Sequence, residues 1–188
     1  MALLRCVLLV TLALLSGVFS ARAQTVGGFD YAPEYDFSEF WAATDGRYFR
    51  VIVAGNPFPQ LPIEQVKQRL LPVMQANKPR PALTFTYQAP PEELRPDYRL
   101  VLVFDPVNDL TAARVCAGQY FLKLPTPGRV YVFGIYCRND LALSQTTAWT
   151  QATGPDDPRL GPMFAQLFLT LFDDRRWHRS PFNPWFAR

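Results

Sequence analysis

Serine and cysteine, the nucleophiles of many hydrolases, occur in this sequence without the partners that such chemistry needs. A nucleophile of this kind requires a nearby base, usually histidine, to take its proton. The only histidine, His178, stands among Arg175, Arg176 and Arg179, and no serine lies in a Gly-x-Ser-x-Gly context. The sequence therefore predicts no catalytic serine or cysteine.

Carboxylates could instead serve hydrolysis if two of them faced one another across a cleft. Adjacent acids occur at Glu92-Glu93, Asp156-Asp157 and Asp173-Asp174. Neighbours in a chain rarely converge in this way, and the three pairs are better explained as a turn, a helix start and a helix end. A hydrolase that uses carboxylates dispersed along the chain stays as the alternative function.

Cys116 and Cys137 are the two cysteines beyond the N-terminal segment, in which Cys6 precedes an apolar run. An even number of cysteines in an exported chain favours a disulfide, with two buried free thiols as the alternative. Two cysteines and one distant histidine make a poor zinc site, and the glycines fit no phosphate-binding loop. We therefore expect a Cys116–Cys137 disulfide, no metal and no cofactor.

The first residues are typical of a cleavable secretory signal peptide. Arg5 is the only charge before an apolar run, Val7–Phe19, and Ala21-Arg22-Ala23 is a small-x-small cleavage site. The alternative is a membrane anchor, but the run is shorter than the roughly 20 apolar residues that span a bilayer. We expect residues 1–23 to be removed, so that an exported protein, periplasmic or secreted, begins at Gln24.

Cleavage also changes the net charge of the chain. The sequence has 19 basic and 16 acidic residues, and the signal peptide would take two arginines and no acid with it, which leaves a net charge near +1. Nucleic-acid binding requires a clustered excess of basic residues, so we expect no nucleic-acid partner. The length that remains suits one domain with its own core.

The two ends of the mature chain carry opposite charge and many aromatic residues. Residues 24–46 contain five acids and no base, and residues 175–188 contain four arginines and no acid. We expect the ends to meet, either as a clamp within the molecule or as a docking surface for another envelope protein, with membrane-surface contact as a further alternative. The candidate partner-binding residues are Trp41, Tyr35, Arg175, Arg176, Trp177, Arg179 and Trp185.

Between these ends, residues 47–174 have the periodicity of a single α+β domain. Runs rich in β-branched and aromatic residues predict strands at 48–53, 83–87, 100–105, 130–136 and 142–150, the last with a helix as its alternative. Asp45-Gly46 predicts a hairpin turn, with a first arm that starts at Phe40. The run at 100–104 is wholly apolar, which is typical of a central strand covered on both faces.

Helices are predicted at three places in this domain. Pro62 can begin one, and Pro72 should kink it or end it early. Asn108 can cap a short helix that ends at Gly118. Asp157 and Pro158 begin the clearest one, whose apolar face comprises Leu160, Met163, Phe164, Leu167, Phe168 and Leu171.

The predicted fold is an antiparallel or mixed sheet packed against two or three helices. The order of the first elements also matches a ferredoxin-like β-α-β-β-α-β core. Together with the export signal, the segments Arg50–Pro59 and Gly154–Arg159 resemble a group of uncharacterised exported proteins of alphaproteobacteria. That resemblance implies export but no activity, and no functional residue follows from it.

These observations favour a non-catalytic exported binding or accessory protein that recognises another protein or a small ligand. The absence of a recognisable catalytic set in the sequence and the charged aromatic ends carry this interpretation. The envelope hydrolase is the alternative, and it would require two acids that converge in a cleft.

Overall fold

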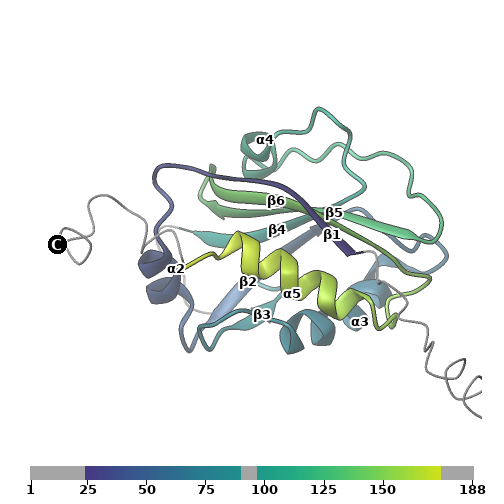
Figure 1. Ribbon diagram of the computed structural model, residues 1–188, viewed down its shortest axis with the longest axis horizontal. Helices are drawn as coiled ribbons and strands as arrows, with labels where there is room; N and C mark the ends of the chain where they lie inside the picture. Colours follow the sequence, from purple (N-terminus) through teal and green to yellow (C-terminus); the bar gives the residue numbers. More distant parts are fainter. Residues whose placement is uncertain (1–23, 90–96, 175–188) are drawn as a thin grey trace, which may run out of the picture.

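The computed structural model describes residues 24–89 and 97–174, which form an α+β fold around one open six-stranded sheet (Figure 1). The strands are β1 (Gln24–Tyr31), β2 (Tyr48–Ala54), β3 (Thr84–Thr86), β4 (Tyr98–Phe104), β5 (Arg129–Arg138) and β6 (Leu141–Gln151). The helices are α2 (Phe37–Thr44), α3 (Ile63–Ala76), α4 (Ala112–Cys116) and α5 (Leu160–Leu171). The predicted signal peptide and the tail at 175–188 lie outside the described residues.

The sheet is mixed, as the sequence predicts, and its strand order is β1-β6-β5-β4-β2-β3. β2 runs parallel to both β3 and β4, whereas the other neighbours are antiparallel. The ferredoxin-like alternative is wrong, because a split βαβ unit has a strand inserted between the two that its helix joins. Here α3 returns the chain directly beside β2, so that β3 pairs with β2 and forms one edge.

One face of the sheet is covered by α2, α3 and α5 and holds the larger core (Figure 1). All six apolar residues predicted for the last helix are buried in α5. Aromatic rings fill the end of this core near α2, where Phe40 stacks on Phe172 with ring centroids 4.2 Å apart. Burial of such rings contributes most of the stability of a core of this kind.

The opposite face carries a smaller core under α4 and the loops on either side of it. Val101 and Val103 of β4 pack there, while Leu100 and Leu102 of the same strand point into the larger core, so β4 is covered on both faces as predicted. The expected disulfide is present: Cys116 at the end of α4 is bonded to Cys137 of β5, with Cα atoms 5.7 Å apart.

The predicted hairpin arm and the predicted cap of the short helix are both wrong. The expected first hairpin arm from Phe40 is the helix α2, which Asp36 caps by accepting a hydrogen bond from the Ser38 backbone N–H at 2.8 Å. Asp45-Gly46 ends this helix, and Gly46 has the positive φ of 69° that such an end favours. The short helix α4 is capped by Thr111 and not by Asn108.

Three other elements differ in part from the prediction: β1 was not expected, and α5 begins at Leu160 and not at Asp157-Pro158. α3 continues through Pro72 to Ala76, where an end or kink was expected, and Pro72 lies on its exposed side. Residues 142–150 are part of a strand, β6, and not a helix. Within the described ranges, no helix is both long and apolar enough to cross a bilayer.

Candidate functional site

Tyr35 and Trp41 are the two predicted partner-binding residues that the structure describes, and they play different parts. The Tyr35 hydroxyl donates to the Asp173 carbonyl at 3.3 Å, and its ring packs against Tyr31 and Tyr136. Tyr35 is therefore a packing residue, whereas Trp41 is substantially exposed on α2. The other candidates lie outside the described residues, namely Arg175, Arg176, Trp177, Arg179 and Trp185.

Several acids of residues 24–46 already have partners within the domain. Glu39 of α2 accepts from one amino group of Arg138, with its two oxygens 2.8 and 2.9 Å from Nη1, and also from the Tyr98 hydroxyl. Burial and the adjacent Glu39 carboxylate raise the pKa of Tyr98 to about 12. Asp45 accepts from the Ala82 backbone N–H at 3.1 Å. These contacts hold α2 and the residue after it against the rest of the domain. Glu39 and Asp45 therefore have structural roles within the domain.

The sequence did not single out the most unusual surface, which lies on the loop between α4 and β5. Phe121, Leu122 and Leu124 are all exposed there, and Leu124 is 90% exposed. Lys123 stands between them and Arg129 follows at the start of β5. We call these five residues the loop surface.

Backbone hydrogen bonds hold the loop surface in place. The Val107 N–H donates to the Phe121 carbonyl at 3.0 Å, and the Lys123 N–H donates to the Asp105 carbonyl at 2.8 Å. Pro106 and Leu122 form an isolated bridge between these two contacts. The segment that follows β4 thus anchors the loop, and the apolar side chains are displayed from a fixed backbone.

Aromatic residues of the sheet extend the loop surface toward β6. Tyr131 and Trp149 are cross-strand partners in β5 and β6. The Arg129 guanidinium lies 5.6 Å from the Tyr131 ring centroid and 4.9 Å from that of Trp149. The Lys123 ammonium lies 5.5 Å from the Tyr131 ring. Cation–π contacts of this kind orient both cations beside the exposed apolar residues.

Asp105 lies beneath this loop and is only 3% exposed. Its backbone has a positive φ of 48°, and its Oδ2 atom is buried without a hydrogen-bond partner among the described residues. Burial raises the pKa of this carboxyl, while the positive charges of Lys123 and Arg129 partly oppose the rise. Asp105 is therefore a buried acid whose surroundings disfavour its ionised form.

The position of Asp105 in the sheet is one where parallel sheets often bind ligands. The chain leaves β2 toward α3 on one face and leaves the adjacent parallel strand β4 toward α4 on the other. The two strand ends are close together, because a Cβ on Gly55 would stand 2.6 Å from the Phe104 carbonyl oxygen. In the sequence, the local signal for this position is Asp105-Pro106, an acid and a proline directly after the apolar run at 100–104.

Acid–base hydrolysis needs a second carboxyl group opposite the first. The charged groups that act on the Asp105 carboxyl are both cations. Asp156 instead pairs with Arg69 at 2.9 Å, and the Arg159 guanidinium holds the pKa of Asp157 well below its usual range at the start of α5. Nor do the residues in the two described ranges include three histidine, cysteine or acidic side chains grouped to hold a metal.

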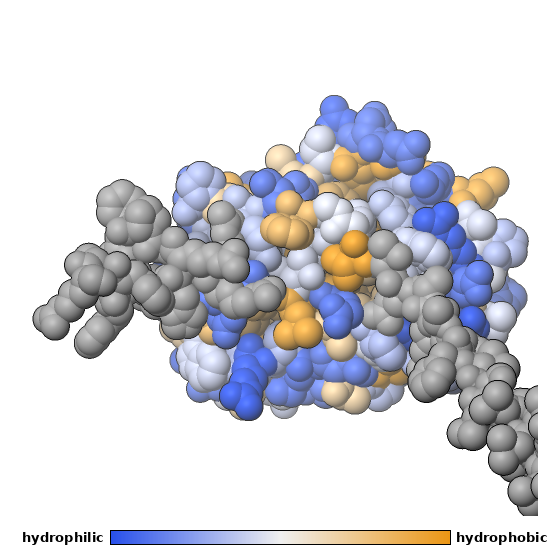
Figure 2. Space-filling model, viewed as in Figure 1, coloured by the Kyte–Doolittle hydropathy of each residue, from blue (hydrophilic) through white to orange (hydrophobic). Residues whose placement is uncertain are grey.

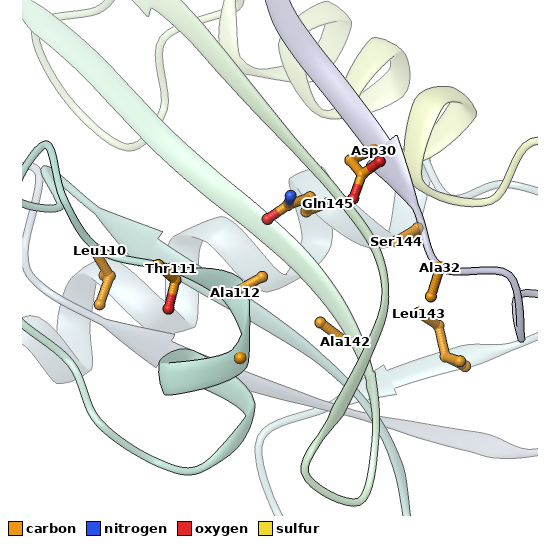
Figure 3. A pocket seen from close by; sticks show the side chains of 10 residues that line it. Asp30, Ala32, Leu110, Thr111, Ala112, Ala142, Leu143, Ser144 and Gln145 are labelled. Atoms are coloured by element: carbon orange, nitrogen blue, oxygen red, sulfur yellow. The ribbon is translucent and has the colours of Figure 1, made fainter.

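A shallow pocket of about 420 Å³ lies beside α4, and none of the five residues of the loop surface lines it (Figure 3). Asp30 of β1 and Gln145 of β6 are cross-strand partners on its sheet side, while Leu110, Thr111 and Ala112 line it from the start of α4. Its volume is within the range of ligand pockets. The Asp30 carboxylate, the Gln145 amide and the Thr111 hydroxyl supply most of its polar side-chain groups. It could take a small polar ligand.

Comparisons with known proteins give little that bears on this chain. No family model matches it, and no curated protein is similar to it. Among solved structures, a dodecamer of a PelC point variant from Paraburkholderia phytofirmans is similar with a TM-score of 0.37 at 11% sequence identity, over 79% of this chain and 96% of that one. A similarity of this size carries no conclusion about fold or function.

Proposed function

We propose that this chain is an exported, non-catalytic accessory protein that binds an acidic partner protein through the loop surface. The observation that carries the proposal is the exposure of Phe121, Leu122 and Leu124 within four positions of one anchored loop. Single exposed leucines are common on protein surfaces, but a contiguous apolar group bordered by polar residues is typical of a binding site.

The charges around the loop surface indicate the chemistry of the partner. Lys123 and Arg129 border the apolar residues, and both are oriented by the rings of Tyr131 and Trp149. An apolar pocket with an acidic rim would complement this arrangement, because opposite potentials across an interface favour encounter and fix orientation. Tryptophan, tyrosine and arginine are also the residues most enriched where binding energy concentrates.

Export and a non-catalytic role rest on separate observations. The predicted N-terminal signal sequence, the Cys116–Cys137 disulfide and the proposed resemblance to exported alphaproteobacterial proteins agree with an oxidising envelope compartment. The acid with the most suggestive surroundings, Asp105, has cations and not a second carboxylate acting on it. The carboxylate-hydrolase alternative therefore gains no support from the described residues.

The proposal is tested by comparing variants of the mature chain in capture from envelope extracts, with quantitative mass spectrometry as the readout. Leu124→Ser should reduce capture of one particular partner about tenfold, the size of effect typical of a central interface residue. A Lys123→Glu/Arg129→Glu double variant should reduce capture of the same partner, and capture by the wild type should weaken at high salt.

Leu141→Ser is the matched control, because Leu141 is also an exposed leucine but lies at the turn between β5 and β6. It should leave capture unchanged. The proposal is wrong if no captured protein depends on Leu124, or if Leu141→Ser has the same effect. If Asp30→Ala or Gln145→Ala abolished capture while Leu124→Ser left it unchanged, the partner would bind at the pocket beside α4 and not at the loop surface.

A further inference from the structure

A second apolar surface lies on the other face of the molecule, around the last turn of α5. Phe29 is 65% exposed, Trp41 41% and Leu169 57%. Figure 2 shows apolar areas among hydrophilic ones on this face, which α5 crosses in Figure 1. Because α5 and the sheet fill the core below, these exposed side chains are not explained by the packing of that core.

Ring contacts join the exposed residues and their half-buried neighbours into two groups, which meet through the buried rings of Tyr136 and Phe40. Phe29 and Tyr31 have ring centroids 5.6 Å apart, and Tyr31 and Tyr35 are 5.1 Å apart. On α2, the Phe37 and Trp41 rings are 6.1 Å apart. We call these five aromatic residues, together with the exposed Leu169 of α5, the aromatic band: Phe29, Tyr31, Tyr35, Phe37, Trp41 and Leu169.

Hydrogen bonds place the end of the described chain inside the aromatic band. The Tyr31 hydroxyl donates to the Thr170 carbonyl, and the Tyr35 hydroxyl donates to the Asp173 carbonyl at 3.3 Å. Phe172, which follows α5, stacks on Phe40 of α2. The next segment of the chain therefore starts beside exposed aromatic rings, at Asp174.

We infer that the tail, residues 175–188, docks on the aromatic band of its own chain. Its composition fits, because it contains four aromatic residues that can cover the rings and four arginines. The segments that carry the band and the end of α5 supply acids of the opposite charge. These acids are Glu34, Asp36, Asp173 and Asp174. The inference is independent of the loop surface, which lies on another part of the molecule.

Chain length and connectivity favour the tail over a second molecule as the occupant. Trp177 is three positions beyond Asp174, a span of at most about 11 Å, so this tryptophan can reach α2. A tethered segment binds at a high effective concentration, which a separate chain must match in solution. Burial of the aromatic rings supplies the attraction, and the charges set the orientation.

Photocrosslinking of the full mature chain tests this inference. With p-benzoylphenylalanine in place of Trp41, irradiation should produce a cross-link to a peptide from residues 175–188. In an equal mixture of ¹⁴N- and ¹⁵N-labelled protein, the two cross-linked peptides should carry the same label, which shows that they come from one chain. The probe replaces a side chain that is already exposed, so the fold should tolerate it.

The same probe in place of Phe121, on the loop surface, is the matched control and should give no cross-link to the tail. Trp177→Ser/Trp185→Ser in the Trp41-probe protein should reduce the yield at least fivefold. Mixed-label cross-links would show a second copy as the occupant, and the absence of tail peptides would show that the tail does not dock there. Either result overturns the inference without affecting the test of Leu124.

Discussion

At the scale of single residues, Asp105 is an acidic side chain in a buried position that disfavours its charged form. Asp105 is 3% exposed and its Oδ2 atom has no hydrogen-bond partner in the described part of the chain, so the ionised carboxylate destabilises the folded protein. Lys123 and Arg129 reduce this cost, but burial is the larger influence on its pKa. The positive φ of 48° at this position offers a partial compensation, because aspartate and asparagine adopt this backbone conformation more readily than most residues.

The pH dependence of Asp105→Asn follows from the raised pKa. In the unfolded chain an aspartate titrates near 3.9, below its value in the folded protein, so the unfolded state loses this proton first as the pH rises. The favourable contribution of Asp105 is thus complete at pH values below the unfolded pKa and is lost as the pH rises through the folded pKa. Asp105→Asn should be more stable than the wild type at pH 7.

The measurement is the free energy of unfolding in denaturant at a series of pH values from 3 to 8. The gain in stability of Asp105→Asn should shrink as the pH falls, because the wild-type carboxyl then becomes neutral in both states. Asp109→Asn is a suitable control, since Asp109 is an exposed aspartate on the same segment. A difference between Asp105→Asn and wild type that does not change with pH would contradict the assignment.

At the scale of elements, the sequence predicted those whose signals are local. The apolar stripes of α3 and α5 and the β-branched runs of β2, β4 and β5 were each recognisable within one segment. α2 was read as a strand because Asp45-Gly46 is common both in hairpins and at helix ends, and only the Asp36 cap with helical spacing distinguishes them. β1 was missed because Gly27-Gly28 interrupts its alternation where the register shifts.

The candidate site was less predictable than the fold for a related reason. The backbone of Asp105 is held by segments far along the chain, since its N–H donates to the Tyr131 carbonyl and its carbonyl accepts from the Lys123 N–H. The exposure of Leu124 likewise depends on how that loop is anchored, which no local pattern reveals. Trp41 was selected from composition and is exposed, whereas Tyr35 was selected in the same way and is half-buried against Tyr136.

The disulfide is the main covalent link between elements, and its removal should have a measurable cost. Cys116 and Cys137 are separated by 21 positions, and their bond joins α4 to the sheet. Closing a loop of this length should stabilise the protein by about 3 kcal/mol in the chain-entropy model. Cys116→Ala/Cys137→Ala should therefore lower the free energy of unfolding by about that amount.

Reduced wild-type protein is the control for this variant, because it lacks the bond but keeps both sulfur atoms. The two should have similar stabilities in denaturant unfolding. If the double variant matched the oxidised wild type, the bond would not contribute to stability. If it fell far below the reduced protein, lost packing in the small core around Cys137 would be the larger effect.

At the scale of the whole molecule, the two faces of the sheet divide the proposed roles. The larger core lies under α2, α3 and α5, and the aromatic band that we assign to the tail lies on the same side. The smaller core lies under α4, and the loop that follows α4 carries the surface proposed for a partner. A protein arranged in this way could cover one apolar surface with its own chain and leave the other available.

Both proposals assume that the working molecule is the exported chain that begins at Gln24. The Ala21-Arg22-Ala23 sequence has the small residues that signal peptidase requires at its cleavage site. Intact-mass measurement of protein from the native envelope should therefore give a chain without residues 1–23. The same mass should be two hydrogen atoms lower than that of the reduced chain, because the proposed export would place Cys116 and Cys137 in an oxidising compartment. Ala23→Leu should block cleavage and leave the longer precursor, whereas a wild-type protein that keeps residues 1–23 would show that the segment is an anchor.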